Sequence, residues 1–198
     1  MTDKNKTVIG LLVDRSGSMG AIKEDMEGGI RSFIESQKEV PGECQVALAQ
    51  FDNVYDLVYP LTDLSDAPDY RLVPRSMTAL NDACGYFITW LGEELYKLPE
   101  DERPGTVIVN IITDGFENSS REWTLESVRK LMDQQRDVYD WEFVFMGSDV
   151  TTETTAHGYG IDATRTIRYS TEAVDTGMNA GATMSGLIRT SRLADPNK

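Results

Sequence analysis

Hydrophobic residues occur along this chain in short continuous runs that alternate with longer stretches of helical spacing. The run Val8–Val13 is apolar or small at every position, which is typical of a strand buried on both faces of a sheet. The residues that follow carry apolar side chains at steps of three and four, so a helix is expected over about 21–40. The same pattern predicts strands at 44–51, 54–61, 106–113, 141–146 and 166–169, and helices over about 80–99, from 125 onward, and over 171–194.

The second and third predicted strands are separated only by Asp52 and Asn53. Both residue types tolerate positive φ, so a tight hairpin is expected there. Asp56 and Pro60 in the second arm favour a position at the edge of a sheet, because a charge and a missing N–H donor both discourage further pairing. Elsewhere strands and helices alternate, which predicts a mainly parallel sheet with helices on both faces and one antiparallel arm at its edge.

The predicted C-terminal helix at 171–194 contains three glycines. Each glycine weakens a helix by about 1 kcal/mol relative to alanine, so this helix is expected to be the least stable in the chain. A shorter helical or irregular piece is expected across 149–160, with Ser148 or Asp149 as its cap.

The chain has 198 residues, of which 33 are acidic and 19 basic, giving a net charge of −14. This charge disfavours nucleic-acid binding, because a protein needs basic side chains to neutralise phosphates, and it disfavours an anionic membrane surface for the same reason. Hydrophobic residues make up 40% and charged residues 26%, which is typical of a globular protein and not of a disordered one. The length favours one domain spanning 1–198, with a core over about 6–170 followed by the C-terminal helix.

The apolar run near the N-terminus is too short for the hydrophobic region of a signal peptide, and no stretch approaches the ~18 apolar residues that span a bilayer. We therefore expect a cytoplasmic protein. In a reducing compartment Cys44 and Cys84 are most simply interpreted as free thiols in the core. His157 is the single histidine and no paired cysteines accompany it, so it is interpreted as a loop residue and not as a zinc ligand.

Oxygen-bearing side chains follow two of the buried strands and precede one helix. The segment Asp14-Arg15-Ser16-Gly17-Ser18 comes directly after the first strand, and Thr113-Asp114-Gly115 ends the strand at 106–113. Thr78 lies just before the helix that starts near residue 80. Doubly wound sheets place their ligand sites beyond the carboxyl ends of the strands, where the strand order reverses. We therefore expect these three segments to converge at that edge of the sheet.

These segments resemble the metal-ion-dependent adhesion site of the von Willebrand factor A (VWA) family, which is built from Asp-x-Ser-x-Ser, a loop threonine and the aspartate of an Asp-Gly pair. The resemblance covers about residues 6–170. It implies a doubly wound, Rossmann-like α/β fold of three layers, in which helices cover both faces of a mainly parallel six-stranded sheet with one antiparallel edge strand. By the same resemblance the metal ligands are Asp14, Ser16, Ser18, Thr78 and Asp114.

The chain departs from the family in one loop, since Ser76 and Met77 precede Thr78 where many members have glycine. With no disulfides, signal or membrane anchor expected, it looks like the stand-alone intracellular members of bacterial or phage type. The stretches at 77–82 and 145–149 are the parts that resemble those members most.

The resemblance implies Mg²⁺ as the bound ion, with Mn²⁺ or Ca²⁺ as alternatives. Mg²⁺ requires near-octahedral oxygen coordination, and neutral hydroxyl groups donate to it only weakly. The resemblance implies that at least one of Asp14 and Asp114 acts through bound water, so the ion would keep much of its charge. Such a cation gains strongly from one outside anion, so the expected partner is a protein that presents an Asp or Glu carboxylate. The chain is thus interpreted as a metal-dependent protein–protein interaction module and not as an enzyme. Arg15 is expected to orient the loop or a nearby carboxylate, and residues 117–119 are interpreted mainly as a solvated loop.

Two other functions compete with this interpretation. A metal-dependent phosphohydrolase with Asp14 as nucleophile would use a second aspartate as general acid. The chain has Ser16 at that position, and a serine does not protonate a leaving group at neutral pH. The other alternative is a metal-dependent self-assembling structural protein, because the 33 acidic residues offer many carboxylates to the metal of a neighbouring copy.

Overall fold

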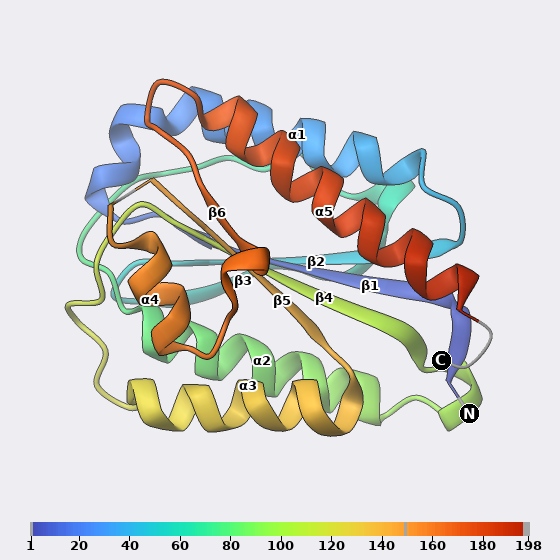
Figure 1. Cartoon of the computed structure of the whole chain (residues 1–198). Helices are drawn as coiled ribbons and strands as arrows, with labels where there is room; N and C mark the ends of the chain where they lie inside the picture. The colour runs from blue at the N-terminus through green and yellow to red at the C-terminus, as the bar shows by residue number, and fades with distance from the viewer. Residues whose placement is uncertain (1, 149, 196–198) are drawn as a thin grey trace.

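The computed structural model describes residues 2–148 and 150–195. Its centre is a six-stranded sheet in the order β3-β2-β1-β4-β5-β6 (Figure 1). β3 pairs with β2 in the antiparallel sense, whereas the other four pairings are parallel. The expected mainly parallel sheet with one antiparallel edge strand is therefore confirmed. The strands are β1 (Asp3–Asp14), β2 (Glu43–Phe51), β3 (Tyr55–Asp63), β4 (Pro104–Thr113), β5 (Glu142–Gly147) and β6 (Thr166–Arg168).

Helices cover both faces of this sheet, so the molecule has three layers (Figure 1). α1 and α5 lie on one face, and α2, α3 and α4 lie on the other. None of the described helices combines the length and the apolar character that crossing a membrane would require. The helices are α1 (Lys23–Lys38), α2 (Leu80–Tyr96), α3 (Leu125–Tyr139), α4 (Thr152–Gly158) and α5 (Val174–Ala194), with short 3₁₀ turns at Gly17–Ile22, Leu64–Asp66, Glu100–Glu102 and Ala163–Arg165.

The central strand β1 contributes side chains to both faces, which explains why its sequence is apolar throughout. Ile9, Leu11 and Val13 belong to the core beside α1 and α5, while Val8 and Leu12 belong to the core on the opposite face. β1 pairs with β2 along one edge and with β4 along the other. The strand order therefore reverses around β1, and the carboxyl ends of β1 and β4 meet at the edge where such folds bind ligands.

Most elements lie where the sequence predicts them, with differences at their ends. The helix expected from about residue 21 is preceded by the 3₁₀ turn Gly17–Ile22, and its α-helical part is α1. The helix expected from residue 125 onward is α3, and Thr124 is its N-cap, because the Thr124 hydroxyl accepts a hydrogen bond from the Ser127 N–H at 3.2 Å.

α4 differs more from the expectation. It follows Thr151, whose side chain makes no capping hydrogen bond. Ser148 is therefore not its cap, and Asp149, the other residue expected in that role, lies outside the described residues. His157 is exposed on α4 and does not lie in a loop. Within the described residues, no group of three or more His, Cys, Asp or Glu side chains is arranged to hold a metal.

Both cysteines are free thiols, as expected. Cys84 is buried on α2, and Cys44 on β2 is half-buried. Burial raises the pKa of the Cys44 thiol to about 11, so it is protonated at neutral pH. Neither cysteine therefore offers a reactive thiolate.

The turn of the β2–β3 hairpin has a different backbone conformation from the expected one. Residues 52–54 connect the strands, and neither Asp52 nor Asn53 has a positive φ. Instead, the Asp52 Oδ1 atom accepts a hydrogen bond from the Val54 N–H at 2.6 Å, which closes the turn through a side chain. Asp56 and Pro60 lie on β3 at the sheet edge, as expected.

The glycines of α5 have a packing role that helix propensity does not indicate. A Cβ atom on Gly177 would lie 2.6 Å from the Cβ atom of Tyr169, a core residue. A Cβ atom on Gly186 would make an ordinary contact, 3.4 Å from Cγ2 of Val40. Gly177 therefore lets the first turn of α5 approach the sheet closely.

Replacing Gly177 with alanine is expected to destabilise the protein by about 1–3 kcal/mol, because the added methyl group overpacks the contact with Tyr169. Gly186→Ala is the matched control, since it adds the same group to the same helix without a clash. That control is expected to be neutral or to stabilise the helix by up to about 1 kcal/mol. Urea denaturation measures both changes, and equal free energies of unfolding for the two variants would contradict the packing role.

Candidate metal centre

Asp14 ends the central strand β1 and is fully buried, with 0% of its surface exposed. Its Oδ1 atom accepts a hydrogen bond from the Ser16 N–H at 2.6 Å, and its Oδ2 atom accepts one from the Thr113 hydroxyl at 2.6 Å. Thr113 is the last residue of β4, the neighbouring strand. The Asp14 carboxylate therefore joins the carboxyl ends of the two strands around which the strand order reverses.

Ser16, Ser18 and Asp114 form a chain of hydrogen-bonding groups beside Asp14. The two serine Oγ atoms are 3.1 Å apart, and the Ser18 hydroxyl donates to Oδ1 of Asp114 at 2.8 Å. Ser16 is buried, Asp114 is half-buried and Ser18 is exposed. The first loop and the loop after β4 thus share one polar cluster that reaches the solvent.

Thr78 joins this cluster from the segment before α2. An ideal Cβ atom on Gly115 would lie 2.9 Å from Thr78 Oγ1, 3.3 Å from Asp14 Oδ2 and 3.4 Å from Ser16 Oγ. Three oxygen atoms therefore surround one small space, which a methyl group would fill and which Gly115 leaves open. The structure brings together the residues that the resemblance singled out, namely Asp14, Ser16, Ser18, Thr78 and Asp114.

Asn118 holds Thr78 in place through two hydrogen bonds to its main chain. The Asn118 Oδ1 atom accepts from the Thr78 N–H at 2.9 Å, and the Asn118 N–H donates to the Thr78 carbonyl at 2.9 Å. The loop after β4 is therefore hydrogen-bonded to the segment that carries Thr78. The expectation of a mainly solvated loop at 117–119 is wrong, because this loop is bound to the start of α2.

Two carboxylates add further contacts between the same segments. Glu117 accepts hydrogen bonds from the N–H groups of Asn81 and of residues 119–120 at 2.8 to 3.0 Å. Asp82 accepts from the N–H groups of residues 121–123 at 2.7 to 2.9 Å. Hydrogen bonds to charged acceptors are stronger than those between neutral groups, so the loop after β4 and the first turn of α2 are held together firmly.

A second buried carboxylate, Asp52, lies beside the first loop with 0% of its surface exposed. Its Oδ2 atom accepts hydrogen bonds from Nε of Arg75 at 2.6 Å and from Nε of Arg15 at 3.2 Å. Arg15 also forms an ion pair with Asp56, with Nη2 and Oδ2 2.5 Å apart. The Asp52 carbonyl accepts from the Ala79 N–H at 2.8 Å. Arg15 therefore orients nearby carboxylates, which is the role expected for it.

Ser76 occupies the point where the chain turns before Thr78. Its φ of 61° is in the left-handed region, which residues other than glycine seldom adopt. The Ser76 carbonyl accepts a hydrogen bond from the Gly17 N–H at 3.2 Å. The loop thus has the backbone conformation that glycine favours, and Thr78 keeps its place in the cluster although the sequence has serine at this position.

Burial raises the pKa of both aspartates in the cluster. It raises the pKa of Asp14 to about 6, although hydrogen bonds from Thr113 and Ser16 offset part of the shift. Burial also raises the pKa of Asp114 above its usual range. Within residues 2–148 and 150–195, no basic side chain pairs with either carboxylate. The charged form of Asp14 is therefore costly in an environment made of hydroxyl and amide groups alone.

Sequence reasoning missed the roles of Thr113 and Asp82 and gave residues 117–119 mainly the role of a solvated loop. Thr113 carried a usable signal, because it directly precedes the Asp-Gly pair at the end of a strand. Asn118, Glu117 and Asp82 act mainly on main-chain groups, and no sequence pattern marks such contacts. Asp52 was correctly interpreted as a turn residue. Its contacts with Arg15 and Arg75 were missed, because these arginines come from loops that are distant in the chain.

No protein-family model and no curated protein sequence matches this chain. Solved structures do resemble it. Proximal thread matrix protein 1 from the mussel byssus matches with a TM-score of 0.68 and 14% identity over 91% of this chain, which spans 46% of that protein. The von Willebrand factor domain of the type V pilus tip protein Mfa5 from Porphyromonas gingivalis matches with a TM-score of 0.65 and 10% identity, over 91% of this chain and 95% of that one.

A further structure of the mussel protein has zinc in its metal-ion-dependent adhesion site and matches with a TM-score of 0.61 and 13% identity, over 91% of this chain and 46% of that one. Identities this low show the fold alone. The chain therefore has the doubly wound α/β fold of VWA domains, as the sequence resemblance implied, and it spans less than half of the mussel protein.

Glu117→Gln is expected to destabilise the protein by about 1–3 kcal/mol, because the carboxylate accepts several N–H groups that join two segments. Glu126→Gln is the matched control, since it removes only an exposed ion pair with Lys130 and is expected to destabilise the protein much less than Glu117→Gln. Urea denaturation measures the global change, and amide hydrogen exchange at Asn81 reports local opening. Equal losses in the two variants would show that Glu117 does not hold the loops together.

Proposed function

We propose that this chain is a metal-dependent protein-binding domain, in which a Mg²⁺ ion at the cluster binds a carboxylate of a protein partner. The observation that carries the proposal is a contrast between two buried carboxylates at one edge of the sheet. Asp52 is stabilised by two arginines, whereas no basic side chain in the described part of the chain pairs with Asp14. Buried charges in proteins are paired or bind metals. A cation from solution would compensate Asp14 as the arginines compensate Asp52.

The donor set fits a hard divalent cation. The proposed ligands are Asp14, Ser16, Ser18, Thr78 and Asp114. Carboxylate and hydroxyl oxygens are the ligands that Mg²⁺ takes in proteins, and Mn²⁺ or Ca²⁺ share the preference for oxygen. Gly115 keeps open the space between three of these oxygens. When bound, the ion would supply a Lewis-acidic position for an outside carboxylate.

The proposed ligands would neutralise a bound ion only in part. The three hydroxyl ligands are neutral, and the resemblance implies that at least one of the two aspartates acts through bound water. Asp14 is fixed by Thr113 and Ser16, and Asp114 is oriented by Ser18. An anionic side chain from a partner is therefore favoured over a neutral one. Phe116 and Met77, which flank the cluster in sequence, are 54% and 51% exposed and add apolar surface around it.

A binding role is favoured over a phosphohydrolase. The Ser16 hydroxyl lies in contact with the Ser18 hydroxyl and offers no carboxylic acid beside Asp14. The resembling structures include a thread matrix protein and a pilus tip protein, which agrees with a binding role.

Self-assembly through the same site is the second candidate. A copy of this chain offers many acidic side chains, and one resembling structure is that of a byssus matrix protein. The single-domain organisation, the cytoplasmic location and the bacterial or phage origin stay predictions.

Gly115→Ala is expected to weaken Mg²⁺ binding at least about tenfold, because its methyl group would occupy the space between the oxygens of Thr78, Asp14 and Ser16. Gly17→Ala is the matched control in the first loop, where the nearest atom to the new Cβ is the Ser76 carbonyl oxygen at 3.5 Å. Isothermal titration calorimetry with MgCl₂ measures both affinities. Unchanged Mg²⁺ affinity in Gly115→Ala, or no binding by the wild type, would refute the proposed site.

A partner captured by the wild-type protein in Mg²⁺ is expected to be released by EDTA and not to bind Asp14→Ala. The capture uses an extract of the organism that encodes the chain, followed by cross-linking to locate the acidic residue of the partner. Gel filtration with Mg²⁺ and with EDTA separates the second candidate, because self-assembly predicts a larger species in Mg²⁺ alone. A partner retained equally under all conditions would contradict a metal-bridged carboxylate.

A further inference from the structure

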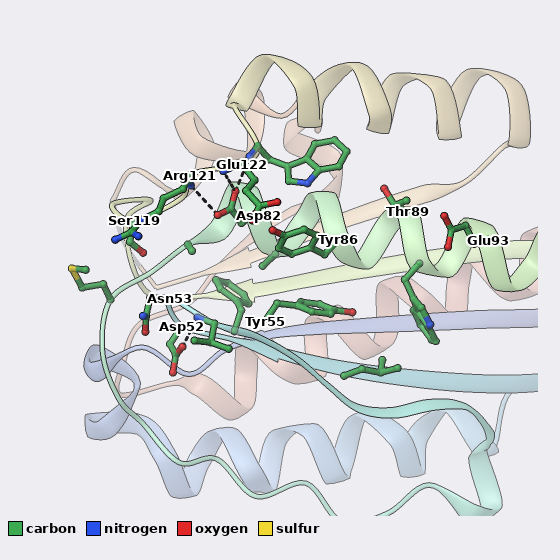
Figure 2. A pocket seen from close by; sticks show the side chains of 18 residues that line it. Asp52, Asn53, Tyr55, Asp82, Tyr86, Thr89, Glu93, Ser119, Arg121 and Glu122 are labelled. Atoms are coloured by element: carbon green, nitrogen blue, oxygen red, sulfur yellow. Dashed lines mark hydrogen bonds between the residues drawn. The ribbon is translucent and has the colours of Figure 1, made fainter.

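A groove of about 710 Å³ begins beside the candidate metal centre and runs between β3 and α2. We call it the α2 groove. Ser119 and residues 121–123 close it on the side of the loop after β4 (Figure 2). Met77 and Ala79, the two neighbours of Thr78 in the chain, both line it. A partner segment bound at the metal centre would therefore enter this groove without leaving the protein surface.

Charged side chains are distributed unevenly along the α2 groove. Figure 2 shows Asp52, Ser119 and Arg121 at one end and Glu93 at the other. Asp52 is compensated by two arginines, and Arg121, Asp82 and Glu122 lie toward the same end of the groove. Glu93 is exposed and lines the far end. Carboxylates therefore outnumber basic side chains in the lining of the groove.

Aromatic rings line the groove between these ends. The rings of Tyr55 on β3 and Tyr86 on α2 lie at an interplanar angle of 54°, with centroids 5.7 Å apart (Figure 2). Trp90 and Glu93 follow Tyr86 on the same face of α2, because residues four and seven positions apart share one side of a helix. Glu122 adds a second carboxylate, and its hydrogen bond with the Tyr86 hydroxyl raises the pKa of Tyr86 to about 12.

We propose that the α2 groove binds a lysine or arginine side chain of the same partner segment whose carboxylate binds at the metal centre. The proposal rests on the function proposed above for that centre. Aromatic faces beside carboxylates stabilise a cationic side chain through cation–π and ion-pair contacts. A second acidic side chain would be repelled by Glu93 and Glu122, and an apolar one would leave the negative charge of both carboxylates uncompensated. The partner segment is therefore acidic at one end and basic at the other.

The length of α2 sets the spacing between the two charges. Leu80, in the first turn, and Trp90 are separated by about 15 Å along the axis, at ~1.5 Å per residue. An extended segment advances ~3.3 Å per residue, so it covers this distance in about five residues. The basic residue is therefore expected four to six positions, about 15 Å, from the metal-bound Asp or Glu.

The test is a selection from a displayed library of random peptides with one fixed central Asp, carried out on the wild-type protein in Mg²⁺. The selected peptides are expected to carry Lys or Arg at a constant spacing of about five residues from the Asp. Their affinity for Glu93→Lys is expected to fall about tenfold or more. Glu24→Lys is the matched control, because it makes the same charge change at an exposed glutamate on α1, on the opposite face of the sheet, and is expected to bind as the wild type does.

The tryptophan indole N–H signals in an NMR titration with a selected peptide give a second readout. Those of Trp90 and Trp123, which line the groove, are expected to shift, whereas that of the buried Trp141 serves as an internal control. Peptides with no constant basic position, with an acidic or apolar residue there instead, or with unchanged affinity for Glu93→Lys would overturn the proposal.

A parallel library with Asn in place of the fixed Asp separates this inference from the function on which it rests. If both libraries yield the same basic residue, and EDTA has no effect on binding, the metal-bridged carboxylate fails while the cation specificity of the groove is supported. If the Asp is required in Mg²⁺ but no basic position emerges, the groove proposal fails and the metal-bridged carboxylate is supported.

Discussion

The buried carboxylate of Asp14, at the end of the central strand, is the constraint on which the carboxyl edge of the sheet depends. A charge removed from water must be compensated by hydrogen bonds or by an opposite charge. Thr113 and Ser16 supply two short hydrogen bonds, and these fix the end of β4 and the first loop relative to β1. The compensation is incomplete, since burial still raises the pKa of Asp14 to about 6. The surrounding hydroxyl groups leave a place for the cation that would complete it.

Other carboxylates at this edge are compensated from within the protein, and each one connects segments that are distant in the chain. Asp52 joins the hairpin to Arg15 and Arg75, while Glu117 and Asp82 accept main-chain N–H groups across the gap between α2 and the loop after β4. The acidic composition therefore has a structural use beyond net charge. Because these three acids take partners within the protein, a cation at Asp14 would be bound by loops that are already in place.

The fold was predictable from sequence because burial on two faces makes a strand such as Val8–Val13 apolar throughout, and amphipathic helices show their period. The candidate ligands came from the resemblance of three segments to the VWA metal site, and the rule that ligand sites lie at strand ends placed those segments at one edge of the sheet. What the sequence could not reveal depends on contacts between distant segments. Asn118 binds the main chain of Thr78, and Gly177 leaves room for Tyr169. Both contacts form only through tertiary packing, so no local sequence pattern indicates them. The α2 groove is of the same kind, since β3 and α2 meet only in the folded chain.

A net charge of −14 attracts a metal ion and a basic side chain but repels the carboxylate that the proposed centre would bind. Salt screens this repulsion beyond about 8–10 Å, whereas direct coordination acts only at contact. The basic end of a partner segment would therefore be drawn in first, toward Glu93, and its acidic end would be brought to the metal centre at short range. On this argument the groove governs the rate of association and the metal centre governs retention, because long-range fields change on-rates more than they change the lifetime of a complex.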